Sequence, residues 1–145
     1  METQKQFKRR FSFEFFPPKT DKGWEKLQGV RNTLAEVDPD FFSVTFGAGG
    51  STRDRTVQTV LDLHKRGVST APHLSCVGAT RDSIAELLDV YRDNGINRIV
   101  ALRGDMPSGM GAAGELRYAN ELVSFIREYS GDTFNIEVAA YPEFH

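Results

Sequence analysis

The sequence predicts an α/β fold built on a parallel sheet. Short β-rich runs alternate with longer amphipathic segments at a step of about thirty residues, which is the size of one βαβ unit. Alternating strands and helices imply right-handed crossovers between parallel strands. Both an open doubly wound sheet and a barrel satisfy this order. The count of units favours the barrel, because four βα units plus a fifth strand make half of a (β/α)8 TIM barrel, which takes about 250 residues.

Five runs bounded by Gly, Pro or Asp predict the strands. They are residues 11–16, 41–46, 69–75, 98–102 and 135–140. We expect one domain over residues 1–145, the N-terminal portion of a barrel truncated at its C-terminus. The first and last strands of such a half barrel have open edges, which favour pairing with another chain.

Four amphipathic segments between these runs predict the helices. They cover residues 24–37, 52–66, about 81–94 and about 115–131. The stripe expected to face the core in the first helix is Trp24, Leu27, Val30, Leu34 and Val37, and in the second Val57, Val60, Leu61 and His64. In the third helix, capped by Thr80, it is Ile84, Leu87, Leu88 and Tyr91, and in the fourth Leu116, Ala119, Val123 and Ile126.

The composition favours small-molecule chemistry. The chain has 145 residues, of which 39% are hydrophobic and 26% charged, so it can form a globular core. Its net charge is −2 with dispersed basic residues, which argues against nucleic acid or an anionic membrane as partner. No window approaches the roughly 18 apolar residues of a membrane span. Cys76 is the only cysteine, which fits a reducing compartment, and we expect a cytoplasmic protein.

Glu14 is a single carboxylate among the phenylalanines of residues 11–16. In a strand it shares a face with Ser12 and Phe16, while the other phenylalanines take the opposite face. If the phenylalanine face packs on the helices, Glu14 points into the barrel near the carboxyl end of its strand, where barrel enzymes keep catalytic groups. Glu14 is then either a proton donor whose pKa is raised by apolar surroundings or a hydrogen-bonded structural carboxylate, and the sequence favours neither.

Polar or glycine-rich segments follow the other predicted strands. The loop within "VTFGAGGST" precedes a helix and can bind an anion, such as a phosphorylated ligand, through residues 47–51, although such a loop is more often a plain tight turn. His73 in "APHLSC" has no accompanying metal ligands, so no metal site is expected, and such a histidine is usually a core residue. Arg103 and Asp105 begin a glycine-rich loop that can fold over a ligand. Tyr141 and His145 in "YPEFH" either line a planar ligand or simply end a strand.

Five segments resemble the methylenetetrahydrofolate reductase family in order and spacing along essentially the whole chain. They are "FEFFPPK", "VTFGAGGSTRDRT", "APHLSC", "ALRGD" and "VAAYPEFH". The resemblance implies a (β/α)8 barrel that holds FAD without a Rossmann domain. It also implies reduction of 5,10-methylenetetrahydrofolate to 5-methyltetrahydrofolate by NADH or NADPH, a step of one-carbon and methionine metabolism.

The resemblance also assigns residues. Glu14 corresponds to the acid catalyst that helps open the folate imidazolidine ring to the iminium, and Asp105 to the carboxylate near the flavin that tunes its reactivity. The positions that match FAD contacts are Thr45, His73, Leu102, Arg103, Gly104, Asp105, Tyr118, Ala119, Tyr141 and His145. Homo-oligomer formation is compatible with the family.

The length of the chain sets a second hypothesis beside the enzyme. The family's second half carries further FAD contacts and the residues that grip folate. The alternative to a reductase is therefore a non-catalytic truncated half barrel that only associates with itself or pairs with another barrel half.

Overall fold

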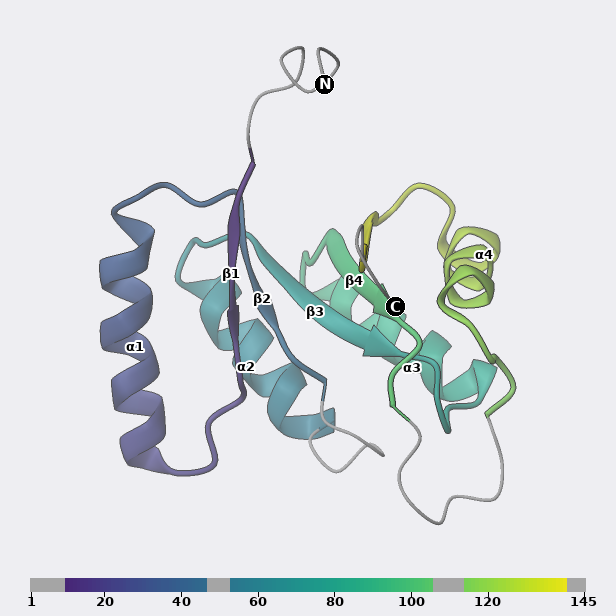
Figure 1. The fold of residues 1–145 in the computed structure, drawn as a ribbon, viewed down its shortest axis with the longest axis horizontal. Coiled ribbons are helices and arrows are strands. Elements are labelled where there is room, and N and C mark those ends of the chain that lie inside the picture. Colours follow the sequence, from purple (N-terminus) through teal and green to yellow (C-terminus); the bar gives the residue numbers. More distant parts are fainter. Residues whose placement is uncertain (1–9, 47–52, 106–113, 141–145) are drawn as a thin grey trace.

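The computed structural model describes residues 10–46, 53–105 and 114–140, and there five strands alternate with four helices (Figure 1). The strands are β1 (Ser12–Phe15), β2 (Phe41–Val44), β3 (Thr70–Ser75), β4 (Arg98–Leu102) and β5 (Asn135–Val138). The helices are α1 (Asp21–Ala35), α2 (Arg53–Lys65), α3 (Arg81–Asp93) and α4 (Ala119–Ser130). Every predicted strand and helix is therefore present, with bounds that differ by a few residues.

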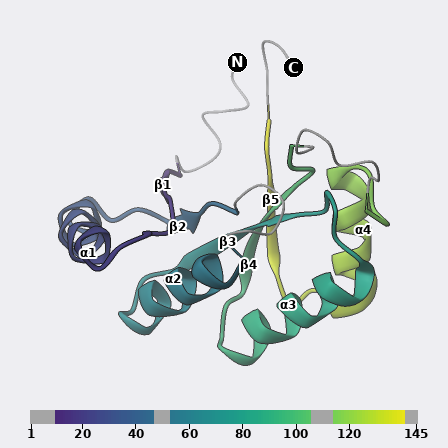
Figure 2. The same ribbon diagram turned by 90° about the horizontal axis from the view of Figure 1, so that it is seen from below.

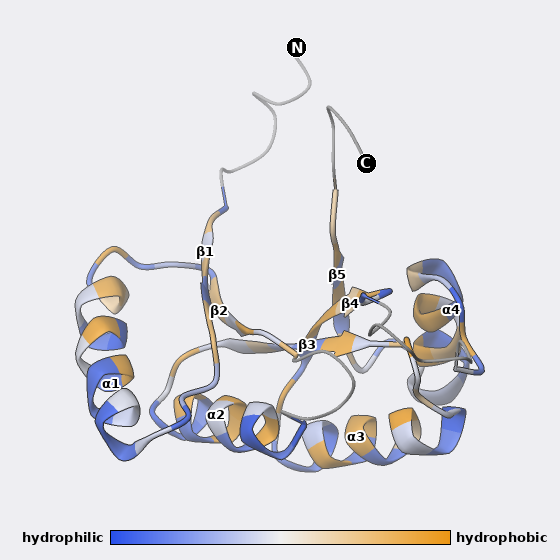
Figure 3. Ribbon diagram, turned by 60° about the horizontal axis from the view of Figure 1, so that its bottom comes forward, coloured by the Kyte–Doolittle hydropathy of each residue, from blue (hydrophilic) through white to orange (hydrophobic). Residues whose placement is uncertain are grey.

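The five strands form one parallel sheet in the order β1-β2-β3-β4-β5. Sequential order without a reversal is the order of a barrel, whereas a doubly wound sheet reverses at a switch point. The helices all lie on one side of the curved sheet, and within the described residues the other side is uncovered (Figures 2 and 3). This confirms a parallel α/β sheet and is consistent with part of a TIM-barrel-like domain.

The hydrophobic core lies between the sheet and the helices. Phe42 of β2 is fully buried, with its ring centroid 5.2 Å from that of Phe15 and 6.1 Å from that of Phe13. Phe13 and Phe15 thus turn toward the helices, although Phe11 at the strand start is 47% exposed. Phe13 and Phe15 therefore meet the condition set by the sequence analysis, and Glu14 lies on the opposite face of β1.

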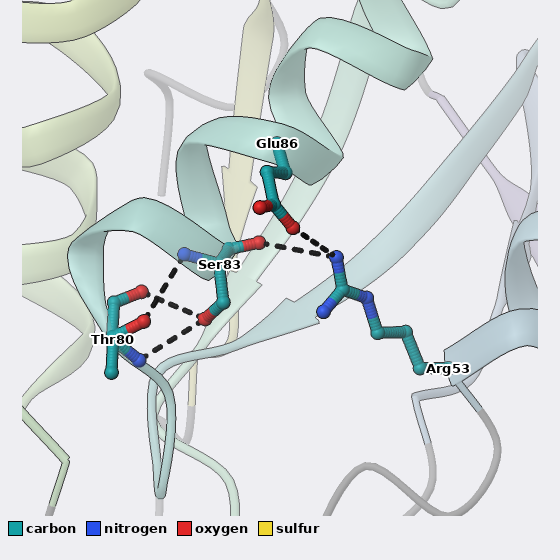
Figure 4. Close-up of polar contacts among 4 residues, drawn as sticks. All are labelled: Arg53, Thr80, Ser83 and Glu86. Carbon is teal, nitrogen blue, oxygen red and sulfur yellow. Dashed lines mark hydrogen bonds and ion pairs between the residues drawn. The ribbon is translucent and has the colours of Figure 1, made fainter.

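Helix α3 matches its prediction closely. Ile84, Leu87, Leu88 and Tyr91 are buried. The Thr80 hydroxyl accepts a hydrogen bond from the Ser83 amide at 3.1 Å, and the Ser83 hydroxyl accepts one from the Thr80 amide at 3.1 Å (Figure 4). Arg53 of α2 donates to the Ser83 carbonyl and pairs with Glu86 at 3.3 Å. These contacts hold the N-termini of α2 and α3 together at the carboxyl edge of the sheet.

The predicted core face of α2 is rotated from the observed one. The residues buried in α2 are Thr56, Thr59, Val60 and Leu63. The side chains of Val57, Leu61 and His64 are only half-buried. The threonine hydroxyls donate to the carbonyls of Thr45 at 2.8 Å and Arg55 at 2.7 Å, which removes the penalty for burying them.

Helices α1 and α4 also depart from the predicted stripes. Leu27 is the one buried residue of α1, whereas Val30 is 40% exposed and Val37 lies beyond the helix end. α1 packs at the β1 edge of the sheet, so less of its surface is covered (Figure 1). α4 begins at Ala119, after the buried Leu116, and its buried residues are Leu122, Phe125 and Ile126. No helix in the described part of the chain is long and apolar enough to cross a bilayer.

Candidate active site

The uncovered face of the sheet carries mainly polar and small side chains. Paired residues of parallel strands point to the same side, so the register places side chains in rows across this face. One row is Glu14, Ser43 and Ala71, and a second is His73, Val100 and Glu137. We call this surface the concave face, and it lies opposite the helices (Figure 3).

Glu14 lies on the concave face near the carboxyl end of β1. Its side chain is 50% exposed, and its Oε2 atom lies 3.7 Å from Nε2 of His73. That distance is longer than a hydrogen bond but within ion-pair range when the imidazole is protonated. The apolar enclosure expected around Glu14 is therefore absent in the described residues, because nothing there covers this face.

His73 is buried in the middle of the sheet, with 8% of the residue exposed. Burial lowers the pKa of its imidazole below the usual 6.5, because desolvation disfavours the charged ring, while the Glu14 carboxylate acts in the opposite direction. The ring is therefore neutral at pH 7. His73 is a core residue, as such histidines usually are, and it also touches the predicted acid catalyst.

The Arg103 carbonyl organises the turn after β4. It accepts hydrogen bonds from the Ser75 hydroxyl at 2.9 Å, the Val77 amide at 3.0 Å and the Cys76 thiol at 3.5 Å. Gly104 follows with φ +83°, and a Cβ there would lie 1.9 Å from the Ser75 hydroxyl oxygen. A glycine is thus required by both conformation and space.

The other predicted site residues lie at the same edge of the sheet. Thr45 is half-buried just after β2, and its amide donates to the Phe15 carbonyl at 2.9 Å. Leu102 is half-buried at the end of β4, and the side chains of Arg103 and Asp105 are exposed. Tyr118 and Ala119 begin α4, and Tyr118 is 57% exposed.

Some predictions lie outside the described residues. These are Tyr141, His145 and the glycine loop at residues 47–51. Among the described site residues, the structure brings the side chains of Glu14 and His73 together, and no hydrogen bond or ion pair joins Asp105 to either of them. In the same part of the chain, no group of three His, Cys, Asp or Glu side chains is placed to hold a metal ion.

Two residues that shape this edge were not predicted. Ser75 fixes the Arg103 turn, and its position two residues after His73 could have placed it on the same face. Gly114 packs against the β3–α3 loop so closely that a Cβ would lie 2.4 Å from the Ala79 carbonyl oxygen. Glu115 then donates to that carbonyl at 3.1 Å. The segment before α4 is thus joined to the β3–α3 loop. No local sequence pattern predicts this contact.

A small cleft of about 120 Å³ lies between α2, α3 and the β3–α3 loop. Its lining includes Arg53, Leu74, Ser75, Ser83 and Leu87. Ligand pockets for drug-sized molecules usually enclose about 300 to 1,000 Å³. A dinucleotide therefore does not fit inside this cleft.

Comparison with known proteins decides the family. The sequence profile of the family described as Methylenetetrahydrofolate reductase matches residues 1–145. The chain belongs to this family. It is 45% identical over 135 residues to the 5,10-methylenetetrahydrofolate reductase of Salmonella typhimurium, covering 92% of this chain and 44% of the relative. The resemblance seen in the sequence motifs is thus confirmed.

Two further relatives agree. The 5,10-methylenetetrahydrofolate reductase of Escherichia coli is 44% identical over 135 residues, with 92% of this chain and 44% of the relative covered. Methylenetetrahydrofolate reductase (NADH) 1 of Arabidopsis thaliana is 42% identical over 140 residues, with 93% of this chain and 24% of the relative covered. The chain spans less than half the length of these methylenetetrahydrofolate reductases.

Proposed function

We propose that the chain is part of a flavin-dependent reductase that converts 5,10-methylenetetrahydrofolate to 5-methyltetrahydrofolate with electrons from NADH or NADPH. Family membership supports the reaction, since relatives at 40% identity or more carry this reductase name. The observation that carries the proposal is the position of Glu14. It lies near the carboxyl end of β1 on the uncovered face, beside the buried His73.

Glu14 acts in this proposal as a general acid. The protonated carboxyl donates to a ring nitrogen of the folate, which weakens the carbon–nitrogen bond and allows the imidazolidine ring to open to the iminium. The half-exposed side chain of Glu14 is accessible to a ligand on the concave face. Asp105 supplies a negative charge at the same edge, which favours a cationic iminium electrostatically.

The concave face suits FAD in shape and chemistry. Small residues such as Ser43 and Ala71 let a flat ring approach the strands, and the exposed Arg103 can neutralise a pyrophosphate. Tyr118, which is 57% exposed, can cover an aromatic ring. When bound, FAD carries the hydride between nicotinamide and folate. The residues proposed to hold it are Thr45, His73, Leu102, Arg103, Gly104, Asp105, Tyr118, Ala119, Tyr141 and His145.

The 145 residues are proposed to form a single domain, the N-terminal half of a (β/α)8 barrel. Sequential strand order and helices on one side of the sheet support this assignment. The 44% coverage of bacterial relatives agrees with it. The remaining half would cover the concave face and complete the ligand shell. A cytoplasmic location and homo-oligomer formation stay predictions.

Substitution of Glu14 tests the proposal. In the protein with FAD and a folate acceptor, Glu14→Gln should lower NADH-dependent folate reduction by a factor of about 10² to 10⁴, because the amide cannot donate the proton. Bound flavin should be unchanged. Glu128→Gln is the matched control, since Glu128 is 79% exposed on α4. Unchanged turnover of Glu14→Gln would refute the assignment of the acid.

The second candidate function is a non-catalytic half barrel that associates with itself or with another barrel half. The observation that favours it is the pair of sheet edges, β1 and β5, which have no further strand beside them in the described residues. Sedimentation of the 145-residue chain tests this candidate. Dimers or larger species that dissociate on dilution would support it, and a folded, strictly monomeric chain would count against it.

A further inference from the structure

The contact between Glu14 and His73 joins two strands that are not neighbours. Glu14 is on β1 and His73 on β3, with β2 between them, yet Oε2 and Nε2 are 3.7 Å apart. The two groups differ in their exposure to solvent, because the His73 side chain is 11% exposed and the Glu14 side chain is 50% exposed. A movement of one proton between the two groups would therefore change the charge of one buried and one accessible group.

Other charged groups on the concave face are engaged elsewhere or lie at its rim. β2 contributes no charged side chain, and the helices pack on the opposite face. Arg98 of β4 is ion-paired with Glu137 of β5. Arg103 is exposed beyond the end of β4. Within the described residues, Glu14 is thus the carboxylate that pairs with His73.

We propose that Glu14 and His73 are coupled in their protonation, and that His73 is a positioning residue that restores the proton Glu14 donates when the two atoms close from 3.7 Å to hydrogen-bond distance. This rests on the proposed function, in which Glu14 protonates the folate. After donation the Glu14 carboxylate raises the fraction of imidazole that carries a proton from solvent, although burial keeps that fraction the minor one. The imidazolium then returns that proton to the carboxylate. Over one cycle a single proton passes from water to the folate nitrogen, and both side chains return to their starting states.

Titration of the histidines by NMR tests the pair without flavin or turnover. In the flavin-free protein with labelled histidines, Glu14→Gln should lower the titration midpoint of His73 by about 0.5 to 1 unit, because the ring loses the nearby negative charge. Glu128→Gln should leave the midpoint unchanged. The signal of His73 is assigned from its loss in His73→Gln. A midpoint that does not move in a folded Glu14→Gln protein would overturn the proposal.

The pH profile of turnover gives a second readout. The wild type should show two apparent pKa values that belong to the pair, and His73→Gln should show one, with kcat lowered about tenfold and KM for folate changed less than twofold. Identical profiles would overturn the proposal. A coupled titration in a protein without folate reduction would refute the proposed function but keep the pair. Folate reduction without the coupled titration would refute the Glu14–His73 pair but keep the proposed function.

Discussion

Gly104 shows how a single residue holds the carboxyl edge of the sheet in place. Its left-handed φ of +83° turns the chain directly after Arg103, and the absence of a side chain lets the Ser75 hydroxyl reach the Arg103 carbonyl. The neighbouring Arg103 and Asp105 side chains are left exposed at the proposed ligand surface. The conformation of this turn thus determines where two proposed cofactor contacts lie.

Replacement of Gly104 by alanine should destabilise the protein by about 2 to 4 kcal/mol, because the new Cβ combines a strained φ with a clash against Ser75. Urea unfolding followed by circular dichroism measures the change. Gly104→Ala combined with Ser75→Ala should lose less than the sum of the two single losses, since the clash with the hydroxyl is gone. Gly29→Ala in α1 is the control, because nothing lies within 4 Å of its Cβ position.

His73 should make stability depend on pH in the acid range. Because its folded-state pKa lies below the unfolded value of 6.5, the stabilisation from the neutral ring is complete above pH 6.5 and is lost as the pH falls toward the lowered pKa. The urea midpoint of the wild type should therefore fall more between pH 7 and pH 5.5 than that of His73→Gln. Equal falls in both proteins would contradict the buried neutral imidazole.

At the scale of the elements, Arg98 connects three strands across the concave face. Its guanidinium pairs with Glu137 of β5 and lies 4.7 Å from the ring centroid of Phe41 in β2. The Arg98 side chain is 15% exposed, so its charge depends on these partners. The interaction anchors β5, which is an edge strand of the described sheet.

Glu137→Ala should lower the free energy of unfolding by about 1 to 2 kcal/mol, because it leaves the buried Arg98 charge without its partner. It should also lower the protection of the β5 amides from hydrogen exchange. Hydrogen exchange of the β5 amides, compared with those of β3, measures the local effect. The double variant Arg98→Met with Glu137→Leu should recover most of the loss. Equal protection of β5 in the wild type and Glu137→Ala would show that the pair does not anchor this strand.

The N-terminal cap of α3 gives a second prediction for an element. Thr80→Ala removes the hydroxyl that accepts from the Ser83 amide and should lower the free energy of unfolding by about 1 kcal/mol. Thr80→Ser keeps the hydroxyl, so its free energy of unfolding should stay within a few tenths of a kcal/mol of the wild-type value. If both variants unfold at the same urea concentration, the cap contributes nothing measurable.

At the scale of the whole molecule, the element order could be predicted from the sequence because strand and helix periods differ clearly. The α3 stripe was correct since its buried residues are all large and apolar. The α2 stripe was correct for Val60 but missed Thr56 and Thr59, because a hydrophobic pattern does not show that their hydroxyls bond to carbonyls. Val30 was misplaced because the sequence does not show how much of α1 the sheet edge covers.

The candidate site was predicted in part. The alternation of β1 and the position of Glu14 near its end followed from local sequence. The contact with His73 did not, because it depends on the stagger between β1 and β3, which no local pattern encodes. The same holds for the donors around the Arg103 carbonyl, which come from residues 26 to 28 positions earlier in the chain.

Flavin retention by the 145-residue chain tests the central claim most directly. The chain is mixed with FAD and passed through gel filtration, and the flavin absorbance that elutes with the protein is measured beside its circular dichroism. The account predicts that about one flavin per chain elutes with the protein, held on the concave face. Less flavin should elute with the Arg103→Ala variant. A folded chain that elutes without flavin would contradict it and leave the non-catalytic half barrel as the better description.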